Sequence, residues 1–164
     1  MELNMALSLT SAGLSDAFSS FVELRQSLPS MVEAISPFLD QLMRFVKKFR
    51  NGDGSEVDIE IALREALTNA IVHGNHEDPE KRVYIGTRCS PNGEVSLTIR
   101  DQGKGFDYLV LPDPTATWNR LSLHGRGIYL MRALMDEVRF EENGTVVKMH
   151  KEPNSGTAGQ SKSR

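Results

Sequence analysis

The residues with the clearest chemical potential are a carboxylate, an amide and an imidazole at regular spacing near the middle of the chain. Glu65, Asn69 and His73 recur every four residues, so in a helix they lie on one face. The rest of residues 61–71 is largely apolar. A carboxylate and an amide on so apolar a helix are costly to bury unless something pairs with them, and Mg²⁺ with a phosphate behind it is one such partner. The alternative is a polar stripe that faces solvent, and this stretch leaves both interpretations open.

A second group of residues combines an aspartate with two glycines directly after a predicted strand. In Asp101-x-Gly103-x-Gly105 the glycines allow the backbone to approach a ligand closely or to adopt positive φ. Asp101 can accept a hydrogen bond from an exocyclic amine. The alternative interpretation of the same residues is a tight turn.

A third group, Gly125-Arg126-Gly127, stands at the predicted start of a helix. Free N–H groups and the helix dipole favour an anion there. Gly-x-Gly is a weak signal by itself, and Arg126 also suits a surface position. Taken together, an amine acceptor, a cation-binding amide and a phosphate-binding helix start describe a site for an adenine nucleotide with Mg²⁺.

The elements that must position these groups follow from periodicity and from breaker residues. The pattern predicts a mostly antiparallel mixed sheet with helices on one face, an α/β fold of the two-layer α+β sandwich type. Ser36 is the expected N-cap of the first helix, with Pro37 at its first position. Short turns are expected at residues 90–93 and around Asn143-Gly144. The predicted strands are residues 18–28 (an edge strand), 82–89, 94–100, 138–141 and 145–150, and the predicted helices are residues 38–49, 58–73 and 128–135.

Length and composition predict one domain in a chain of 164 residues, 39% hydrophobic and 25% charged. We expect a loose arm at residues 1–17, the domain at 18–152 and a disordered tail at 153–164. Cys89 is the single cysteine, which excludes an intramolecular disulfide and predicts a small hydrophobe within a strand.

Charge and hydropathy restrict the partners and the location of the protein. A net charge of −3 argues against a nucleic-acid binder. The basic cluster Arg44, Lys47, Lys48 and Arg50 is expected at the solvated end of a helix. The chain begins without the features of a signal peptide and has no membrane-spanning run, so we expect a cytoplasmic protein without a membrane partner.

The three groups resemble, in order, the N box, the first glycine box and the second glycine box of the GHKL ATPase superfamily, which includes gyrase and histidine kinases. Residues 65–75 and 125–138 look most like the anti-sigma-factor serine kinases within it. The resemblance covers roughly residues 18–152 and is specific, because the three boxes occur in the family's order and spacing.

The resemblance implies a role for each candidate residue. Glu65 would be the general base that activates the acceptor hydroxyl, and Asn69 would ligate Mg²⁺ between the phosphates. Asp101 would bind the adenine amino group within the box that contains Gly103. Residues 106–124 would form a lid over ATP. His73 either touches the nucleotide site or is a buried structural histidine. Around the base and phosphates, Gly105 would shape the pocket, Thr145 would add a hydrogen bond near the base, and Gly125, Arg126 and Gly127 would cradle phosphate.

The resemblance also implies an activity and its partners. It indicates an ATP-dependent serine/threonine kinase that acts as an anti-sigma factor, binds a sigma factor and phosphorylates a serine on a STAS-type anti-anti-sigma protein. A homodimer is expected, with a surface that includes apolar parts of the first helix and the sheet edge. The main alternative is an ATP-binding partner-switch module without meaningful phosphotransfer, against which Glu65 argues. The detached ATPase domain of a histidine kinase ranks lower.

Overall fold

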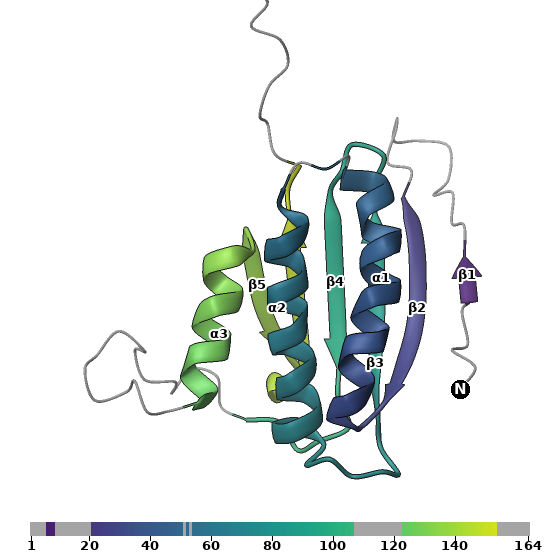
Figure 1. Ribbon diagram of the computed structural model, residues 1–164. Helices are drawn as coiled ribbons and strands as arrows, with labels where there is room; N and C mark the ends of the chain where they lie inside the picture. The colour runs from purple at the N-terminus through teal and green to yellow at the C-terminus, as the bar shows by residue number, and fades with distance from the viewer. Residues whose placement is uncertain (1–5, 9–20, 51, 53, 107–122, 154–164) are drawn as a thin grey trace, which may run out of the picture.

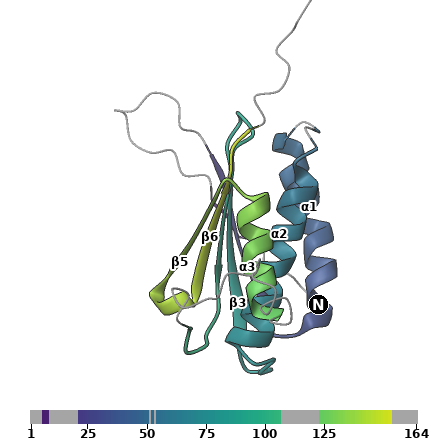
Figure 2. The same ribbon diagram turned by 90° about the vertical axis from the view of Figure 1, so that its left-hand side faces the viewer.

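The computed structural model describes residues 6–8, 21–50, 52, 54–106 and 123–153, which form two layers (Figure 1). One layer is an antiparallel sheet in the order β1-β2-β3-β4-β6-β5, and the other is a set of helices on one of its faces (Figure 2). The strands are β1 (Ala6–Ser8), β2 (Val22–Pro29), β3 (Arg82–Cys89), β4 (Val95–Arg100), β5 (Glu137–Glu141) and β6 (Val146–Lys151). The helices are α1 (Ile35–Arg50), α2 (Glu56–Thr68), the π-helical turn η2 (Asn69–Gly74) and α3 (Leu123–Leu134), with short 3₁₀ turns η1 (Val32–Ala34) and η4 (Glu142–Gly144).

The two-layer α+β sandwich with helices on one face is confirmed, but the expectation of a mixed sheet is wrong. Every pair of neighbouring strands that the structure describes runs antiparallel. Chain reversals join β3 to β4 and β5 to β6, so neither pair needs the crossover connection that parallel strands require.

The edge of the sheet also differs from the prediction. Ala6–Ser8, in the segment expected to be a loose arm, pairs with residues 23–25 as strand β1. The strand predicted at residues 18–28 is therefore an inner strand, and its described part begins later, at Val22. The imperfect alternation of residues 18–28 suggested an edge strand, but alternation within one segment cannot show that three residues near the N-terminus pair with it.

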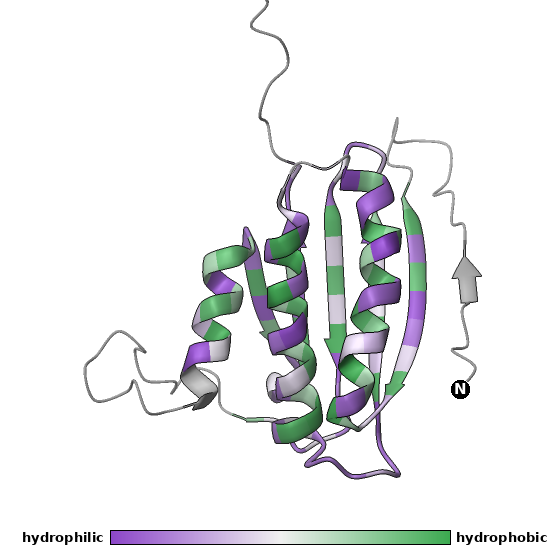
Figure 3. Cartoon of the chain, in the orientation of Figure 1, coloured by the Kyte–Doolittle hydropathy of each residue, from purple (hydrophilic) through white to green (hydrophobic). Residues whose placement is uncertain are grey.

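The core lies between the sheet and the helices and is built from buried apolar residues of both layers. Figure 3 shows that hydrophobic residues recur along both the strands and the helices. In β3 alternate residues are buried, including Cys89, which confirms the prediction of a small hydrophobe within a strand. Burial raises the pKa of the Cys89 thiol to about 12. Six apolar residues of α1 are buried in this core and are not available to the expected dimer surface, whereas Phe45 and Phe49 of the same helix are only partly buried; the six are Ile35, Phe38, Leu39, Leu42, Met43 and Val46.

The start of α1 differs from the prediction because Ser36 has another partner. The helix begins at Ile35, and Ser36 Oγ accepts a hydrogen bond from Arg64 Nη1 at 3.0 Å. The expected N-cap therefore lies inside the first turn and ties α1 to α2. Pro37 is tolerated in this turn because the first N–H groups of a helix have no intrahelical acceptor.

The end of α1 corrects the interpretation of the basic cluster. Lys47 and Lys48 are exposed as expected, but Arg50 is only 2% exposed. Its Nη1 donates to the carbonyl oxygens of Gly93 at 2.6 Å and Glu152 at 2.8 Å, and its Nη2 bonds Ser55 Oγ. Arg50 thus joins the end of α1 to the β3–β4 turn, the start of α2 and the residue after β6.

The helices that carry the candidate residues have shifted bounds. α2 starts at Glu56 and continues after Thr68 as a π-helical turn, and α3 starts at Leu123 rather than at residue 128. The strands predicted at residues 82–89, 94–100, 138–141 and 145–150 are correct to within one residue at each end. Most of the predicted lid and the tail beyond Pro153 lie outside the described residues. Among the described helices, none is long and apolar enough to cross a membrane.

Candidate functional site

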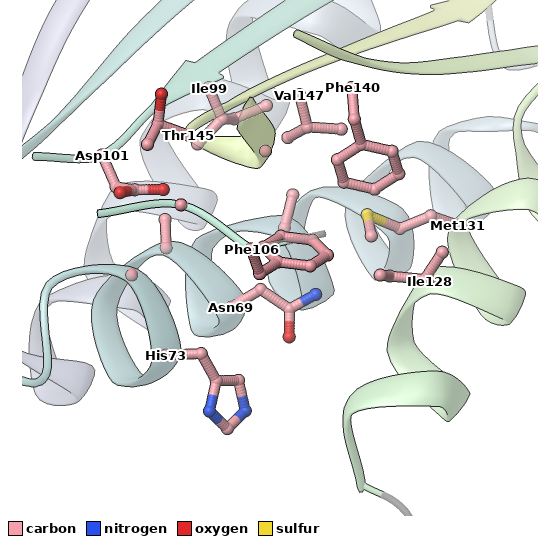
Figure 4. Close-up of a pocket in the computed structure, with 15 residues that line it drawn as sticks. Asn69, His73, Ile99, Asp101, Phe106, Ile128, Met131, Phe140, Thr145 and Val147 are labelled. Carbon is pink, nitrogen blue, oxygen red and sulfur yellow. The ribbon is translucent and has the colours of Figure 1, made fainter. Parts of the chain in front are cut away.

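A cavity of about 360 Å³ lies between the helices and the sheet, at the junction of α2, η2 and α3 (Figure 4). Its volume is in the range of small-molecule sites, about 300–1,000 Å³. Five of the candidate residues line it, namely Asn69, His73, Asp101, Gly105 and Thr145. The other residues that line it are Ala66, Ala70, Gly74, Ile99, Phe106, Ile128, Met131, Phe140, Gly144 and Val147.

Most of the cavity wall is apolar and comes from both layers. Figure 4 shows the sheet residues on one side, with Ile128 and Met131 of α3 at one end. The rings of Phe106 and Phe140 meet edge to face, with centroids 5.8 Å apart. A space with apolar walls and few polar groups suits a flat heterocycle, because burial of its faces is favourable and its edge atoms need specific partners.

Asp101 supplies a polar partner at the end of the cavity next to Thr145 (Figure 4). Its Oδ1 accepts a hydrogen bond from Gly103 N at 2.7 Å, while Oδ2 has no hydrogen-bond donor among the residues that the structure describes. Burial raises the pKa of the Asp101 carboxyl above its usual range, although the bond from Gly103 and the charge of Lys81 act in the opposite direction. The free oxygen of Asp101 can therefore accept a hydrogen bond from an amine that enters the cavity.

Three glycines allow the loop after β4 to pack closely around Asp101. A Cβ on Gly74 would lie 2.5 Å from Asp101 Cγ, and a Cβ on Gly103 would lie 2.2 Å from the carbonyl oxygen of Gly74. Gly105 has φ +76°, and a Cβ there would lie 1.9 Å from the carbonyl oxygen of Asn143. Gly103 does not line the cavity, so it shapes the site through this packing and its bond to Asp101.

The predicted polar face of the second helix divides into two parts. Asn69 and His73 line the cavity from η2, whereas Glu65, half-buried in α2, lies beside it. A Cβ on Gly127 would lie 2.8 Å from Glu65 Oε2 and 3.4 Å from Asn69 Nδ2. The Glu65 carboxylate and the Asn69 amide therefore lie close to the backbone of α3 at Gly127, which brings the first and third groups of candidate residues together.

The remaining candidates take positions that the sequence did not predict. Gly125 and Arg126 lie inside the first turns of α3 and not before it; Arg126 is exposed and does not line the cavity. Thr145 lines the cavity, but its hydroxyl donates to the carbonyl oxygen of Glu142 at 2.8 Å. Its oxygen can then act only as an acceptor toward a ligand.

Gly74 and Asn75 were not among the candidate residues. Gly74 directly follows the helix predicted at residues 58–73, but it lines the cavity and contacts Asp101. Asn75 is 0% exposed and bonds both the start of β3 and the end of β4. The signal available in the sequence was the position of Asn75 directly after a predicted helix. If such an amide is buried, both its oxygen and its nitrogen need hydrogen-bond partners, so it must join neighbouring segments.

Comparison with known proteins shows the family of the chain. Residues 28–151 match the model of the histidine kinase-like ATPase domain. The anti-sigma F factor of Heyndrickxia coagulans is 30% identical over 156 residues, which cover 92% of this chain and 93% of the relative. The serine-protein kinase RsbW of Bacillus subtilis (strain 168) is 37% identical over 101 residues, 57% of this chain and 62% of the relative. The chain therefore belongs to the histidine kinase-like ATPase family, the superfamily that its three boxes resemble, and its domain is one that binds ATP.

Proposed function

We propose that this protein is an ATP-dependent serine/threonine kinase that also acts as an anti-sigma factor in a partner-switching system. Family membership and relatives named as anti-sigma F factor and serine-protein kinase support the proposal. The observation that carries it is the arrangement around one cavity, which has the carboxylate of Asp101 as an acceptor at one end and the amide of Asn69 toward α3, with the carboxylate of Glu65 beside that amide.

Asp101 and the apolar walls would hold the adenine base. The 6-amino group would donate to Asp101 Oδ2, the oxygen without a donor among the described residues. Ile99 and Val147 on the sheet and Met131 on α3 would contact the ring faces. Binding of the base in this way leaves the phosphates on the side of Asn69 and the start of α3.

Asn69 would supply an amide oxygen to Mg²⁺. An amide oxygen fits this ion, which usually keeps several waters and takes few protein ligands together with substrate phosphates. Among the described residues no three His, Cys, Asp or Glu side chains form a metal cluster, which suits an ion held largely by phosphate and water. The bound nucleotide would supply the phosphoryl group, and Gly125, Arg126 and Gly127 would lie near its phosphates.

Glu65 would act as the general base. Its carboxylate lies beside Gly127 and near Asn69, so it can accept the proton of a serine hydroxyl that approaches the phosphate side. A protein that only sequesters its partner has no need of a base at this point. The alternative, an ATP-dependent partner-switch module without phosphotransfer, would need Asn69 and Asp101 but not Glu65.

The partners would be a sigma factor and a STAS-type anti-anti-sigma protein whose serine receives the phosphate. This assignment rests on the names of the relatives and on the motifs of residues 65–75 and 125–138. A cytoplasmic homodimer remains our expectation. The lid predicted at 106–124 and the tail predicted at 153–164 fall largely outside the described residues and stay predictions.

The first test is calorimetric titration with ATP, with Mg²⁺ present and then chelated. We expect binding that depends on Mg²⁺, and Asn69→Ala should abolish that dependence because the amide ligand is lost. Binding of equal strength with and without Mg²⁺, or unchanged binding in Asn69→Ala, would contradict the assignment of Asn69.

The second test separates catalysis from binding. Glu65→Gln should bind ATP with the affinity of the unchanged protein but lose at least about 10²-fold in phosphotransfer to candidate STAS proteins, because the amide cannot accept the proton. Glu60→Gln is the matched control on the same helix, since Glu60 pairs with Arg64 at 3.7 Å and does not line the cavity. Full phosphotransfer by Glu65→Gln would show that Glu65 is not the general base. If the wild-type protein itself shows no phosphotransfer, the alternative of an ATP-binding module that only sequesters its partner is favoured.

A further inference from the structure

We infer that Asn75 and Gln102 are positioning residues that hold Asp101 for recognition of the amino group of a purine, an inference that rests on the proposed function. Neither side chain lines the cavity. Both belong to a closed ring of hydrogen bonds that joins three segments of the chain next to Asp101.

The ring has three members, and each bond in it is of ordinary length. Asn75 Nδ2 donates to the carbonyl oxygen of Arg82 at 3.1 Å, and Arg82 N donates to Gln102 Oε1 at 2.7 Å. Gln102 N closes the ring by donating to Asn75 Oδ1 at 2.8 Å. The end of η2, the start of β3 and the end of β4 are therefore fixed to one another.

The ring replaces the sheet ladder at the point where the ladder ends. The last pair between β3 and β4 is Tyr84 with Arg100. If the same register continued, Gln102 would stand opposite Arg82. The side-chain oxygen of Gln102 accepts the hydrogen bond from Arg82 N in place of a backbone carbonyl of the ladder. On the other side of the same strand, Asp101 N donates to the carbonyl oxygen of Thr145 at 3.0 Å, one residue beyond the pair of Arg100 with Val146.

Asp101 is consequently fixed from both sides, although it lies beyond the end of a strand. The ring also fixes Gly74, whose α-carbon faces the Asp101 carboxyl with space for no additional atom. Asn75 is fully buried, and a buried amide with both atoms bonded resists displacement. The direction of the free Asp101 oxygen, on which discrimination between bases depends, thus depends on Asn75 and Gln102.

The experiment measures discrimination between two nucleotides and not affinity alone. ATP and inosine triphosphate are titrated in parallel with Mg²⁺; the second carries a carbonyl oxygen where adenine carries the amino group, so at this position it presents an acceptor to Asp101 in place of a donor. We expect the unchanged protein to prefer ATP. Asn75→Ala and Gln102→Ala should each lower this preference by at least about fivefold, chiefly by weakening ATP, because the hydrogen bond to a charged acceptor loses its alignment.

Two further measurements keep the result interpretable. Gln102→Ala removes an exposed side chain and should fold even if Asn75→Ala does not, as thermal unfolding will show. Asn92→Ala is the matched control, because it removes a comparable bond from Asn92 Oδ1 to Glu94 N, 3.1 Å long, in the β3–β4 turn outside the cavity. Its preference for ATP should equal that of the unchanged protein.

The outcomes separate this inference from the function on which it rests. A folded Gln102→Ala or Asn75→Ala with the original preference for ATP overturns the positioning role and leaves the nucleotide site intact. An unchanged protein that binds both nucleotides equally overturns the role of Asp101 together with that of the ring. An unchanged protein that binds neither nucleotide overturns the proposed function as well.

Discussion

Asp101 combines two requirements that usually conflict in a carboxylate. It must be buried to meet the edge of a heterocycle, and it must remain ionised to accept a strong hydrogen bond. Burial raises its pKa, while Gly103 N and Lys81 favour the ionised form. On acidification Asp101 therefore takes up its proton at a higher pH than an exposed aspartate does, and this should be measurable in ligand binding.

We predict that the affinity for ATP falls on acidification, and that this fall occurs at a higher pH than it would if the acceptor were an aspartate with an ordinary pKa. The carboxylate binds the amine above the raised pKa, and the acceptor is lost as the pH falls through that pKa. For the free protein the sign is opposite: a folded pKa above the unfolded one costs stability when the group is ionised, and this cost disappears on acidification. Calorimetry across a pH series measures the first effect.

The matched variant for this prediction is Asp101→Asn. Its oxygen would keep the bond from Gly103, so its NH₂ group would face the amine of adenine and donor would meet donor. We expect an affinity loss of about tenfold or more and a profile without the acidic decrease. A decrease that persists in this variant would assign the titration to another group.

At the scale of elements, the approach of α3 to α2 at Gly127 decides whether the carboxylate and the amide can share the site. Gly127→Ala would place a methyl group 2.8 Å from Glu65 Oε2, so the side chain or the helix must move. We predict at least about tenfold lower phosphotransfer, because a displacement of about 1 Å at a reacting centre is costly.

Gly86→Ala is the control for this prediction, since a Cβ at Gly86 would meet Thr98 Cβ at an ordinary 3.8 Å. It should leave phosphotransfer unchanged. Phosphotransfer by Gly127→Ala at the level of the unchanged protein would mean that α3 has room to shift without effect on the site.

The elements also show what the sequence can predict and what it cannot. Alternation was sufficient for β3, where the predicted residues 82–89 match the observed strand. The start of α3 was predicted too late, at residue 128, because glycine is a poor helix former, although Gly125 and Gly127 both lie within the first turns of the helix. The π-helical form of η2 could not be predicted, because it differs from an α-helix only by a shift of one residue in the hydrogen-bond acceptor.

The same limit applies to the site. The sequence located Asn69, Asp101 and Gly105 by their types and spacing, and the structure places them around one cavity. It could not locate the ring, since hydrogen bonds between segments far apart in the chain leave no local pattern; only the position of Asn75 directly after a predicted helix was a local signal. Their roles toward a nucleotide stay predictions.

At the scale of the whole molecule, Arg50 joins four segments that meet at one end of the sandwich. We predict that Arg50→Ala lowers the free energy of unfolding by about 2–5 kcal/mol, because the Gly93 and Glu152 carbonyl oxygens lose their donor inside the protein. Urea unfolding measures the change. Lys47→Ala removes an exposed charge from the same helix and should change the value by less than about 0.5 kcal/mol.

An effect of Arg50→Ala no larger than that of Lys47→Ala would show that water replaces the guanidinium without cost. Since Arg50 lies outside the cavity lining, ATP affinity at temperatures where the variant is folded should not change. Stability and binding can thus be varied separately in this molecule.

The π-helical turn has a last consequence, which concerns insertions and deletions. Asn75 N bonds the carbonyl oxygen of Ala70, five residues earlier, at 2.8 Å, so η2 holds one residue more than an α-helical turn would. A deletion of one residue here must either close the turn with α-helical bonding, at the cost of the extra residue that η2 now holds, or rotate the residues that follow by about 100° around the helix axis. In the second case His73 would leave the cavity and the amide of Asn75 would leave its partners. We therefore expect the number of residues between Asn69 and Asn75 to be more strictly constrained than their identity.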